Sequence, residues 1–372
     1  MQGIWDVSGE NNMKLVFITP TFNLGGYEKV VLGYANAFVK MGHCVTIICG
    51  FKEGVLLEQT HPDVNIVEFG ARVRNFTRPL AKFLKENAVD ILYAGFRTYT
   101  CVAVIARWIS GNRRCVIYGS AHGYGRDSKL TEFLSGRIMR HADVLTAVTQ
   151  ELAEFEAKAL NISLSKYRVF NNPVIDDSVS IQLESHPWLG KNKTVPVVVA
   201  SGRLESGKGI EKTLTVVSEL NKRLNVRLLV LGTGSKLKEL KNQAEELKID
   251  EKVDFPGFVA NPMGYMEQCD AFLHLADIES FGNVIVEALY CNLPVVTTKC
   301  KGPEEIIEHG KYGIVIGEST DPDVVRRGAD ALYDILTGKI KFSGLRERAL
   351  EFDAKYLEPS YLEPYYELRG KD

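Results

Sequence analysis

The chain has 372 residues, too many for one hydrophobic core of ordinary size, and a usual domain length of about 150 residues predicts two domains. Hydrophobic residues make up 45% and charged residues 25% of the sequence, a mixture typical of globular proteins in water. The net charge of −2 excludes the strongly basic balance of a nucleic-acid-binding protein, so we expect no nucleic-acid partner.

Residues 1–12 are polar and lack periodicity, so we expect a disordered leader rather than part of a domain. No signal peptide precedes the first strand, and no apolar run approaches the ~20 residues needed to span a bilayer. The seven cysteines are scattered without a C-x-x-C pair. These features favour a reduced protein in the cytoplasm.

Short β-branched runs alternate with longer amphipathic segments along the first half of the chain. Strands are predicted, in order, at 14–19, 45–49, 90–93, 115–118, 144–148 and 168–170. The apolar spacing of 27–41 predicts a helix, and further helical patterns fall between most of the strands. This alternation indicates βαβ units and a parallel sheet covered by helices.

A second series of the same kind begins near residue 196. Strands are predicted at 197–201, 227–231, 253–255, 271–275 and 294–297, and helices at 210–224, 236–247 and 284–290. The intervening residues 176–195 carry turn signals and predict a linker. The last residues, about 352–372, have Tyr and Leu at helical spacing and are expected to cross back onto the first domain.

The predicted fold class is therefore α/β, with two tandem Rossmann-like, doubly wound domains facing across a cleft. The first is expected at 13–175 and the second at 196–351. In such folds ligands bind outside the carboxyl ends of the strands, so the loops at those ends are the candidate sites.

Two glycine-rich loops have the composition of phosphate sites. Gly25 and Gly26 lie between the first strand and its helix, where backbone N–H groups at a helix N-terminus can approach an anion. The loop 202–209 nearly matches the P-loop pattern, but Gly209 stands where Ser or Thr would bind magnesium, which disfavours a P-loop ATPase or kinase. Arg203 and Lys208 remain as a clamp for a diphosphate.

A third loop combines a helix start with two carboxylates. Gly282 and Asn283 read as the start of the 284–290 helix, which leaves the N–H groups of Val284 and Ile285 for a phosphate. The carboxylates of Glu279 and Glu287 repel phosphate and instead suit the neutral hydroxyls of a ribose and a hexose.

An Asp-x-Asp sequence at 321–323 could suggest a metal site. Asp321 and Asp323 follow Ser319 and Thr320 and precede the helical pattern of 324–336, a context that favours helix capping. We therefore expect no metal and no cofactor.

Together these residues resemble glycosyltransferase family 4, the retaining, nucleotide-sugar-dependent enzymes with the GT-B fold, over residues 13–350. The most specific elements are the E-x7-E pair, Glu279 and Glu287, and then Gly202-Arg203 with Lys208-Gly209. Weaker elements are Gly25-Gly26, Gly232-Thr233-Gly234, 255–258 and Asn172-Pro173, where the family often has Gly after the Asn and this chain has Asn171-Asn172-Pro173.

The resemblance implies roles for individual residues. Arg203 and Lys208 would hold the donor diphosphate, Glu279 the transferred sugar and Glu287 the ribose, while His122, just after the 115–118 strand, would lie over the donor sugar. The implied catalytic residues are therefore Arg203, Lys208, His122 and Glu279. The remaining implied donor-binding residues are Gly25, Gly26, Gly257, Phe258, Gly282, Asn283, Val284, Ile285 and Glu287.

The expected activity is metal-independent transfer of a hexose or N-acetylhexosamine, with retention, from a UDP-linked donor to a glycan or lipid-linked acceptor in cell-envelope polysaccharide synthesis. Residues 71–140 hold 13 Lys and Arg against four Asp and Glu, an excess that fits either the solvated faces of helices or a surface that meets a phosphorylated acceptor or anionic lipid on the inner membrane face. Two alternatives stay open: a nucleotide-sugar epimerase of the same architecture, and a non-catalytic nucleotide-sugar-binding protein. A dehydrogenase is disfavoured because Leu237 stands where its third glycine belongs.

Overall fold

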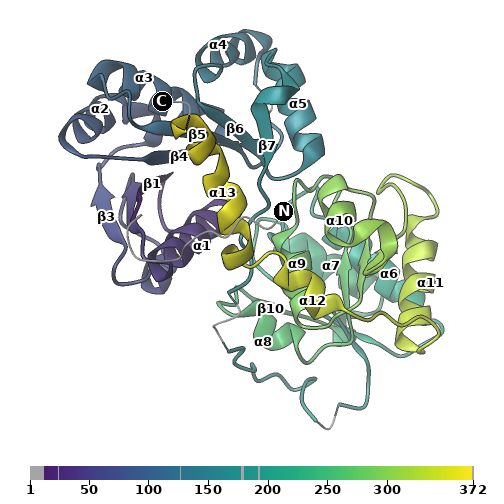
Figure 1. Cartoon of the computed structure of the whole chain (residues 1–372). Coiled ribbons are helices and arrows are strands. Elements are labelled where there is room, and N and C mark those ends of the chain that lie inside the picture. The colour runs from purple at the N-terminus through teal and green to yellow at the C-terminus, as the bar shows by residue number, and fades with distance from the viewer. Residues whose placement is uncertain (1–11, 24, 126, 177–179, 192, 371–372) are drawn as a thin grey trace, which may run out of the picture. The chain divides into compact units, whose positions relative to one another are not determined.

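The computed structural model describes residues 12–370 except 24, 126, 177–179 and 192. The chain forms two compact units, the first made of Met1–Pro173 with Ala354–Asp372 and the second of Val174–Asp353. Each unit is a parallel sheet covered by helices (Figure 1), which confirms the predicted fold class of two doubly wound α/β domains. The leader expected at 1–12 lies outside the described residues apart from Asn12.

In its described part, the first unit contains a seven-stranded sheet of order β3-β2-β1-β4-β5-β6-β7. The strands are β1 Lys14–Thr19, β2 Cys44–Cys49, β3 Asn65–Glu68, β4 Ile91–Gly95, β5 Val116–Ala121, β6 Val144–Ala147 and β7 Tyr167–Val169. The helices are α1 Gly26–Lys40, α2 Thr77–Glu86, α3 Phe96–Ser110, α4 Lys129–Met139, α5 Gln150–Leu160 and α13 Ala354–Arg369, with short 3-10 turns η1 Val55–Gln59, η2 Val73–Asn75 and η3 Leu164–Lys166.

All the strand pairings of this sheet are parallel, and β1 lies between β2 and β4. The strand order reverses there, so the loops after β1 and β4 diverge at the carboxyl edge and leave room for a ligand. The central strands read as continuous apolar runs because helices cover both faces of the sheet.

The C-terminal helix α13 completes the core of the first unit. Tyr361 is buried, and its ring lies 5.0 Å from those of Tyr34 and Phe38 and 5.2 Å from that of Tyr118, measured between centroids. The Tyr118 hydroxyl also donates to the Tyr361 carbonyl at 3.0 Å. These contacts explain why the aromatic spacing near the end of the sequence belongs with the first sheet.

Across the described residues of 174–353, the second unit contains a six-stranded sheet of order β10-β9-β8-β11-β12-β13. The strands are β8 Val197–Ser201, β9 Arg227–Leu231, β10 Val253–Gly257, β11 Ala271–His274, β12 Val295–Thr297 and β13 Gly313–Val315. The helices are α6 Ile210–Leu220, α7 Leu237–Glu246, α8 Pro262–Met266, α9 Asn283–Tyr290, α10 Lys301–Ile306, α11 Val324–Leu336 and α12 Leu345–Leu350, with 3-10 turns η4 Asp250–Lys252 and η5 Glu308–Gly310.

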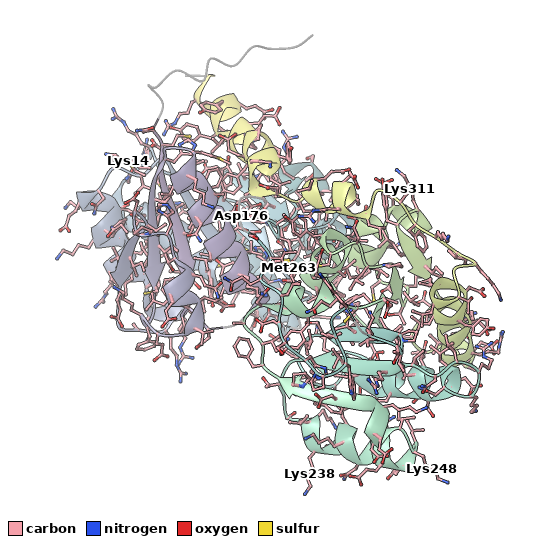
Figure 2. The ribbon with its side chains drawn as sticks, turned by 90° about the horizontal axis from the view of Figure 1, so that it is seen from below. Lys14, Asp176, Lys238, Lys248, Met263 and Lys311 are labelled. Atoms are coloured by element: carbon pink, nitrogen blue, oxygen red, sulfur yellow. The ribbon has the colours of Figure 1, made fainter. Side chains whose placement is uncertain are left out.

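The order of this sheet reverses between β8 and β11, so its ligand position is predicted at the loops that follow these two strands. Apolar side chains from β8, β9, β11, α6 and α11 form one core on this sheet. Side chains project densely from both units, and charged residues such as Lys238, Lys248 and Lys311 extend from the second (Figure 2).

The sequence pattern missed the two edge strands β3 and β13. Both are short, four and three residues, and their side chains are only partly buried, so neither gives a strong periodic signal. Helix α6 ends at Leu220 rather than at 224. The side chain of Asn221 ends it by exchanging hydrogen bonds with the N–H and carbonyl of Val226, both at 3.2 Å.

The segment expected to be a linker, 176–195, is irregular in its described part but is bound to the second unit. The Glu184 N–H donates to the Gly264 carbonyl at 3.1 Å, and the Gln268 side chain donates to the Glu184 carbonyl at 2.8 Å. Lys193 pairs with Asp270 at 2.7 Å. These contacts make the segment an arm on α8 and β11, which turn signals in the sequence cannot distinguish from a free linker.

Candidate functional site

The loop between β8 and α6 is shaped by three glycines with positive φ. Gly202, Gly207 and Gly209 have φ values of +155°, +85° and +72°. A Cβ at Gly209 would lie 1.8 Å from the Leu275 carbonyl oxygen, so no side chain fits there. This explains why the P-loop serine or threonine is absent: the loop packs its backbone directly against the end of β11.

Lys208 and Glu279 meet at the carboxyl edge of the second sheet. The Lys208 ammonium lies 2.8 Å from the Glu279 carboxylate, although 71 residues separate them in sequence. Lys208 comes from the loop after β8 and Glu279 from the loop after β11, which are the neighbouring strands where the sheet order reverses. The structure therefore joins two of the four predicted catalytic residues at the position where a doubly wound sheet binds its ligand.

His274 is the site residue that sequence reasoning missed. It ends β11, and its buried Nε2 lies 3.8 Å from the Glu279 carboxylate, with no hydrogen-bond acceptor or donor among the described residues. The available signal was a histidine at the carboxyl end of a predicted strand. Burial lowers the pKa of the His274 imidazole, while Glu279 raises it and Lys208 lowers it, with a net fall below the ordinary value.

The carboxylate of Glu279 stays ionised because of its neighbours. Burial raises the pKa of Glu279, but the Lys208 ammonium and His274 lower it more, and the net pKa is below its ordinary value. A charged carboxylate can accept hydrogen bonds from sugar hydroxyls, whereas a protonated one would lose part of that capacity. The pair with Lys208 thus keeps Glu279 an acceptor.

The N-terminus of α9 differs from the prediction in one respect. Gly282 caps the helix with φ +106°, and the Ile285 N–H donates to the Gly282 carbonyl at 2.8 Å. The Ile285 amide is therefore already hydrogen-bonded, and the prediction that it is open to a phosphate is wrong for this conformation. Asn283 and Val284, also predicted to meet a phosphate, lie in the same first turn of α9.

The other predicted residues of the second unit lie on or beside this edge. The Gly202 N–H donates to the Leu231 carbonyl at 2.9 Å and the Gly232 N–H to the Gly257 carbonyl at 2.8 Å, so the ends of β8, β9 and β10 are tied together. Arg203 and Phe258, which follow two of these ends, are exposed. Glu287 lies on α9 and is buried.

In the first unit, Tyr27 brings the Gly25-Gly26 loop and His122 together. Gly25 caps α1 and Gly26 begins it, and the ring of Tyr27 lies 4.9 Å from that of His122, between centroids. The Tyr27 hydroxyl donates to the Ile18 carbonyl at 2.5 Å and accepts from the Gly95 N–H at 3.0 Å. The loop and His122 therefore share the carboxyl edge of the first sheet, where its strand order reverses.

His122 is held as a neutral imidazole. Its Nε2 lies 2.6 Å from the Tyr93 hydroxyl, and its ring packs edge-on against both Tyr27 and Phe96. Burial lowers the pKa of His122 to about 3. A neutral ring in this place can donate or accept one hydrogen bond but carries no charge toward a substrate.

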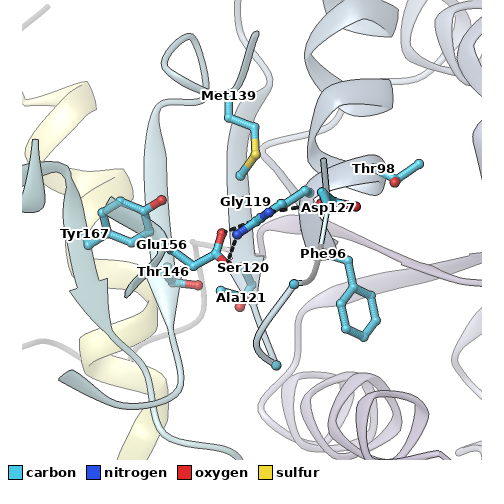
Figure 3. Close-up of a pocket in the computed structure, with 13 residues that line it drawn as sticks. Phe96, Thr98, Gly119, Ser120, Ala121, Asp127, Met139, Thr146, Glu156 and Tyr167 are labelled. Atoms are coloured by element: carbon cyan, nitrogen blue, oxygen red, sulfur yellow. Dashed lines mark hydrogen bonds and ion pairs between the residues drawn. The ribbon is translucent and has the colours of Figure 1, made fainter. Parts of the chain in front are cut away.

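A cavity of about 200 Å³ lies beside His122 in the first unit, between the ends of β5, β6 and β7 and the helices α3 to α5 (Figure 3). Its walls mix apolar side chains such as Phe96 and Met139 with polar and charged ones. The hydroxyl oxygens of Thr146 and Tyr167 are buried in this wall without a hydrogen-bond partner among the described residues. Buried polar groups are normally satisfied, so the cavity has room and donors for water or a hydroxyl-bearing molecule.

Arg97 crosses this cavity and is held by three carboxylates. Its guanidinium binds both oxygens of Glu156, at 2.8 and 3.0 Å, and also contacts Asp127 at 3.0 Å and Glu132 at 3.3 Å, and Figure 3 draws the contacts with Glu156 and Asp127 as dashed lines. Burial alone would lower the pKa of Arg97, but the three carboxylates raise it above its ordinary value. Arg97 is thus a fixed cation of the interior.

The structure corrects the reading of two charge patterns. Within the basic region 71–140, Arg97 pairs with Glu156 and Arg107 with Asp143, so neither adds to a surface charge. Asp321 accepts from the Asp323 N–H at 2.9 Å and pairs with Arg327. Asp323 occupies the N-cap position of α11, but its side chain makes no capping hydrogen bond, so the expected cap is replaced by this turn and ion pair.

Among the described residues, no helix is both long and apolar enough to cross a bilayer. The seven cysteines are free thiols. Burial raises the pKa of several of them, to about 11 for Cys101 and about 12 for Cys269, so these thiols are protonated at neutral pH and unsuited to nucleophilic chemistry.

Comparison with known families assigns both halves of the chain. The model described as glycosyltransferase family 4 matches residues 24–178, and the model described as glycosyl transferases group 1 matches residues 182–339. Together the two matches cover both parallel sheets apart from β1, and they include the loops that carry Gly25, His122, Lys208 and Glu279.

Individual relatives agree with these models. A Campylobacter jejuni enzyme described as GalNAc-alpha-(1->4)-GalNAc-alpha-(1->3)-diNAcBac-PP-undecaprenol alpha-1,4-N-acetyl-D-galactosaminyltransferase is 24% identical over 376 aligned positions, which cover 96% of this chain and 99% of that enzyme. A second C. jejuni enzyme, described as N-acetylgalactosamine-N,N'-diacetylbacillosaminyl-diphospho-undecaprenol 4-alpha-N-acetylgalactosaminyltransferase, is 26% identical over 279 residues, covering 73% of this chain and 75% of that enzyme.

Solved structures show the same fold. Anabaena HepE in complex with UDP and glucose superposes with a TM-score of 0.76 at 22% identity, covering 94% of this chain and 98% of HepE. The lipopolysaccharide outer core galactosyltransferase WaaB superposes with a TM-score of 0.73 at 19% identity, covering 95% of this chain and 99% of WaaB. At these identities the likeness establishes the two-domain architecture.

Proposed function

The chain belongs to the family 4 glycosyltransferases, and from that premise we propose that it transfers a hexose or N-acetylhexosamine from a UDP-linked donor to a glycan or lipid-linked acceptor, with retention of configuration. The observation that carries the proposal is the Lys208–Glu279 pair at the switch point of the second sheet. The pair places a cation for phosphate and a carboxylate for hydroxyls side by side, and a nucleotide diphosphate sugar offers both groups.

Each charged group has one role in this proposal. Breaking the anomeric bond leaves negative charge on the diphosphate, which Arg203, Lys208 and the first-turn amides of α9 stabilise. Glu279 accepts from hydroxyls of the transferred sugar, and Glu287 from those of the ribose. His122 supplies a neutral hydrogen-bonding group from the first unit. Because the cations and amides neutralise the developing charge, the reaction needs no metal ion.

The comparisons support the substrate classes. Two relatives are named as N-acetylgalactosaminyltransferases acting on undecaprenol-linked acceptors, and a structural neighbour was solved with UDP and glucose. These names favour a UDP-linked hexose or N-acetylhexosamine as donor and a lipid-linked saccharide as acceptor. Retention follows the resemblance to family 4.

The first experiment is a thermal-shift screen of nucleotide diphosphate sugars, since a ligand that binds the folded state raises the melting temperature by mass action. We expect UDP-sugars to give the largest shift. The Arg203→Ala variant should lose the shift while its own melting temperature stays unchanged, because Arg203 is exposed. An unchanged shift in Arg203→Ala would contradict the assigned donor site.

Turnover separates the proposal from the isomerase alternative. A transferase releases nucleotide diphosphate in proportion to an added acceptor, whereas an epimerase converts the donor without releasing it. We expect release that depends on added lipid-linked saccharide and persists in excess chelator. Activity abolished by chelator and restored only by divalent ions would contradict the metal-free mechanism.

A further inference from the structure

We propose that the outer face of α4, with the end of α3, is the surface by which this protein docks on an anionic lipid membrane. Five large apolar side chains are each more than half exposed here: Leu130, Phe133 and Leu134 on α4, and Trp108 and Ile109 on α3. The three on α4 follow i, i+3, i+4 spacing and so share one face of the helix. We call these five residues the α4 patch.

The patch lies on one continuous surface because α3 and α4 pack side by side (Figure 1). The Cys101 thiol of α3 contacts the Ser135 carbonyl of α4 at 3.9 Å, and the Trp108 ring lies 5.2 Å from that of His141, just beyond the end of α4. Trp108 and Ile109 therefore extend the apolar face toward the carboxyl end of α4.

The opposite face of α4 is fixed inward, so the apolar face has no freedom to turn into the core. Glu132 on α4 and Asp127 just before it both point to the buried Arg97. Gly136 packs so closely on α5 that a Cβ there would lie 2.1 Å from the Leu160 carbonyl oxygen. Acidic and small residues thus face the interior, and apolar residues face out.

The rim of the patch carries charge of one sign. Lys129, Arg137 and Arg140 on and beside α4 are exposed, as are Arg113 and Arg114 after α3. Within the described part of the chain, no carboxylate forms an ion pair with any of these five side chains. The Arg137 guanidinium lies 5.6 Å from the centre of the Phe133 ring, so cation and apolar group are neighbours.

This combination selects a membrane over a protein partner. Apolar side chains that enter the acyl boundary, with lysine and arginine at the level of the phosphates, are the features of a helix lying on an anionic bilayer. Tryptophan also favours that interface. The nearby carboxylates of Asp127, which is 40% exposed, and Glu132 are both paired with Arg97, so their charge toward anionic lipid is offset. The inference is independent of the donor site, and its test needs no catalytic activity.

The test is co-sedimentation of the full chain with vesicles of phosphatidylcholine alone or mixed with phosphatidylglycerol. We expect stronger binding to the mixed vesicles, weakened by salt. Leu130→Ser/Phe133→Ser should lower the partition coefficient at least about tenfold, since two exposed apolar side chains that would enter the bilayer are lost. Lys129→Gln/Arg137→Gln should weaken the preference for phosphatidylglycerol, since two of the five rim cations are lost.

Two matched controls keep the test specific. Leu164→Ser/Leu183→Ser removes two other exposed leucines, and Lys238→Gln/Lys241→Gln removes two exposed lysines of α7 in the second unit. Both controls should bind as the wild type does. Equal loss in a control and in the matching α4 variant, or wild-type binding by both α4 variants, would overturn the proposal.

A second measurement locates the contact. In a chain with Trp5→Phe and Trp188→Phe, Trp108 is the remaining tryptophan. Vesicles that carry brominated acyl chains should then quench its fluorescence and shift its emission to the blue. Vesicle binding without quenching of Trp108 would place the contact elsewhere and refute the α4 patch. Self-association that the Leu130→Ser/Phe133→Ser variant abolishes in the absence of lipid would make the patch a subunit interface instead.

Discussion

Replacing Arg97 with Met is expected to destabilise the first unit strongly, because the change leaves the Glu156 carboxylate buried without its partner. Arg97 binds both oxygens of Glu156, at 2.8 and 3.0 Å, and only 2% of the Glu156 side chain is exposed. At an effective dielectric constant of about 20, unit charges about 3 Å apart attract by roughly 5–6 kcal/mol. Desolvation offsets part of this, and removing one partner of a buried pair costs about 3–5 kcal/mol, which is the loss we expect.

The network makes the opposite change less costly. In Glu156→Gln, Arg97 keeps Asp127 at 3.0 Å and Glu132 at 3.3 Å, so we expect a loss of about 1–2 kcal/mol. The double variant Arg97→Met/Glu156→Gln removes both buried charges. We expect the double variant to be more stable than Arg97→Met alone by at least about 1 kcal/mol. Such a gain would show that the two contacting residues are energetically coupled.

Urea unfolding followed by Trp108 fluorescence measures these losses in the first unit, in a chain with Trp5→Phe and Trp188→Phe. Arg168→Met is the matched control, since the Arg168–Glu367 pair is exposed in the same unit and should cost less than about 1 kcal/mol. A double variant no more stable than Arg97→Met, or a loss in Arg97→Met no larger than the control, would refute the reasoning.

Three further predictions concern the site. Lys208→Met should cost about 10²–10³ in kcat, the usual effect of losing one preorganised donor. It should also raise the pKa of Glu279 and move the acid limb of the pH–rate profile to higher pH; an unmoved limb would contradict the pairing. Gly209→Ser should lower the free energy of unfolding of the second unit by about 2–5 kcal/mol, because a side chain there is strained at positive φ and clashes with the Leu275 carbonyl. The control Gly70→Ser has a similar φ but open space around it, and it should cost about 1–2 kcal/mol. Denaturant unfolding measures both losses. The His122 ring should not titrate between about pH 5 and 8 by NMR. The unfolded ring takes up its proton near pH 6.5, whereas the folded ring does so only near pH 3. His122 should therefore reduce the free energy of unfolding as the pH falls from about 6.5 toward 3. A midpoint near 6.5 for the folded ring would contradict its burial.

The sequence determined the fold class and the loops of the site because both depend on local information. Strands buried on both faces must be continuous apolar runs, and helices that cover them must be amphipathic, so periodicity alone predicts alternating βαβ units. Glycines in the loop 202–209 and at 282 mark backbone conformations that few other residues adopt. Parallel strands end at one edge of a sheet, so residues after β8 and β11 were expected to meet.

Only the tertiary structure decided which side chains are partners. His274 reads in sequence as one more residue of a strand, and its proximity to Glu279 depends on how the loop after β11 folds back toward the end of that strand. The Ile285 amide looked available because a helix start leaves N–H groups open, but the first turn of α9 brings the Gly282 carbonyl onto that group. Hydrogen bonds of this kind depend on the backbone dihedral angles of the intervening residues, which residue type limits but does not set.

For the charged residues, too, the sequence determined the composition and the tertiary structure determined the partners. The sequence determined that residues 71–140 are basic, but a count cannot distinguish an arginine in the interior from one on the surface. The fold buries Arg97 against Glu156 because α3 and α5 pack beside the same strand, and it leaves Lys129 and Arg137 beside exposed Leu130 and Phe133. Composition is additive along the chain, whereas burial depends on what the fold packs against each side chain.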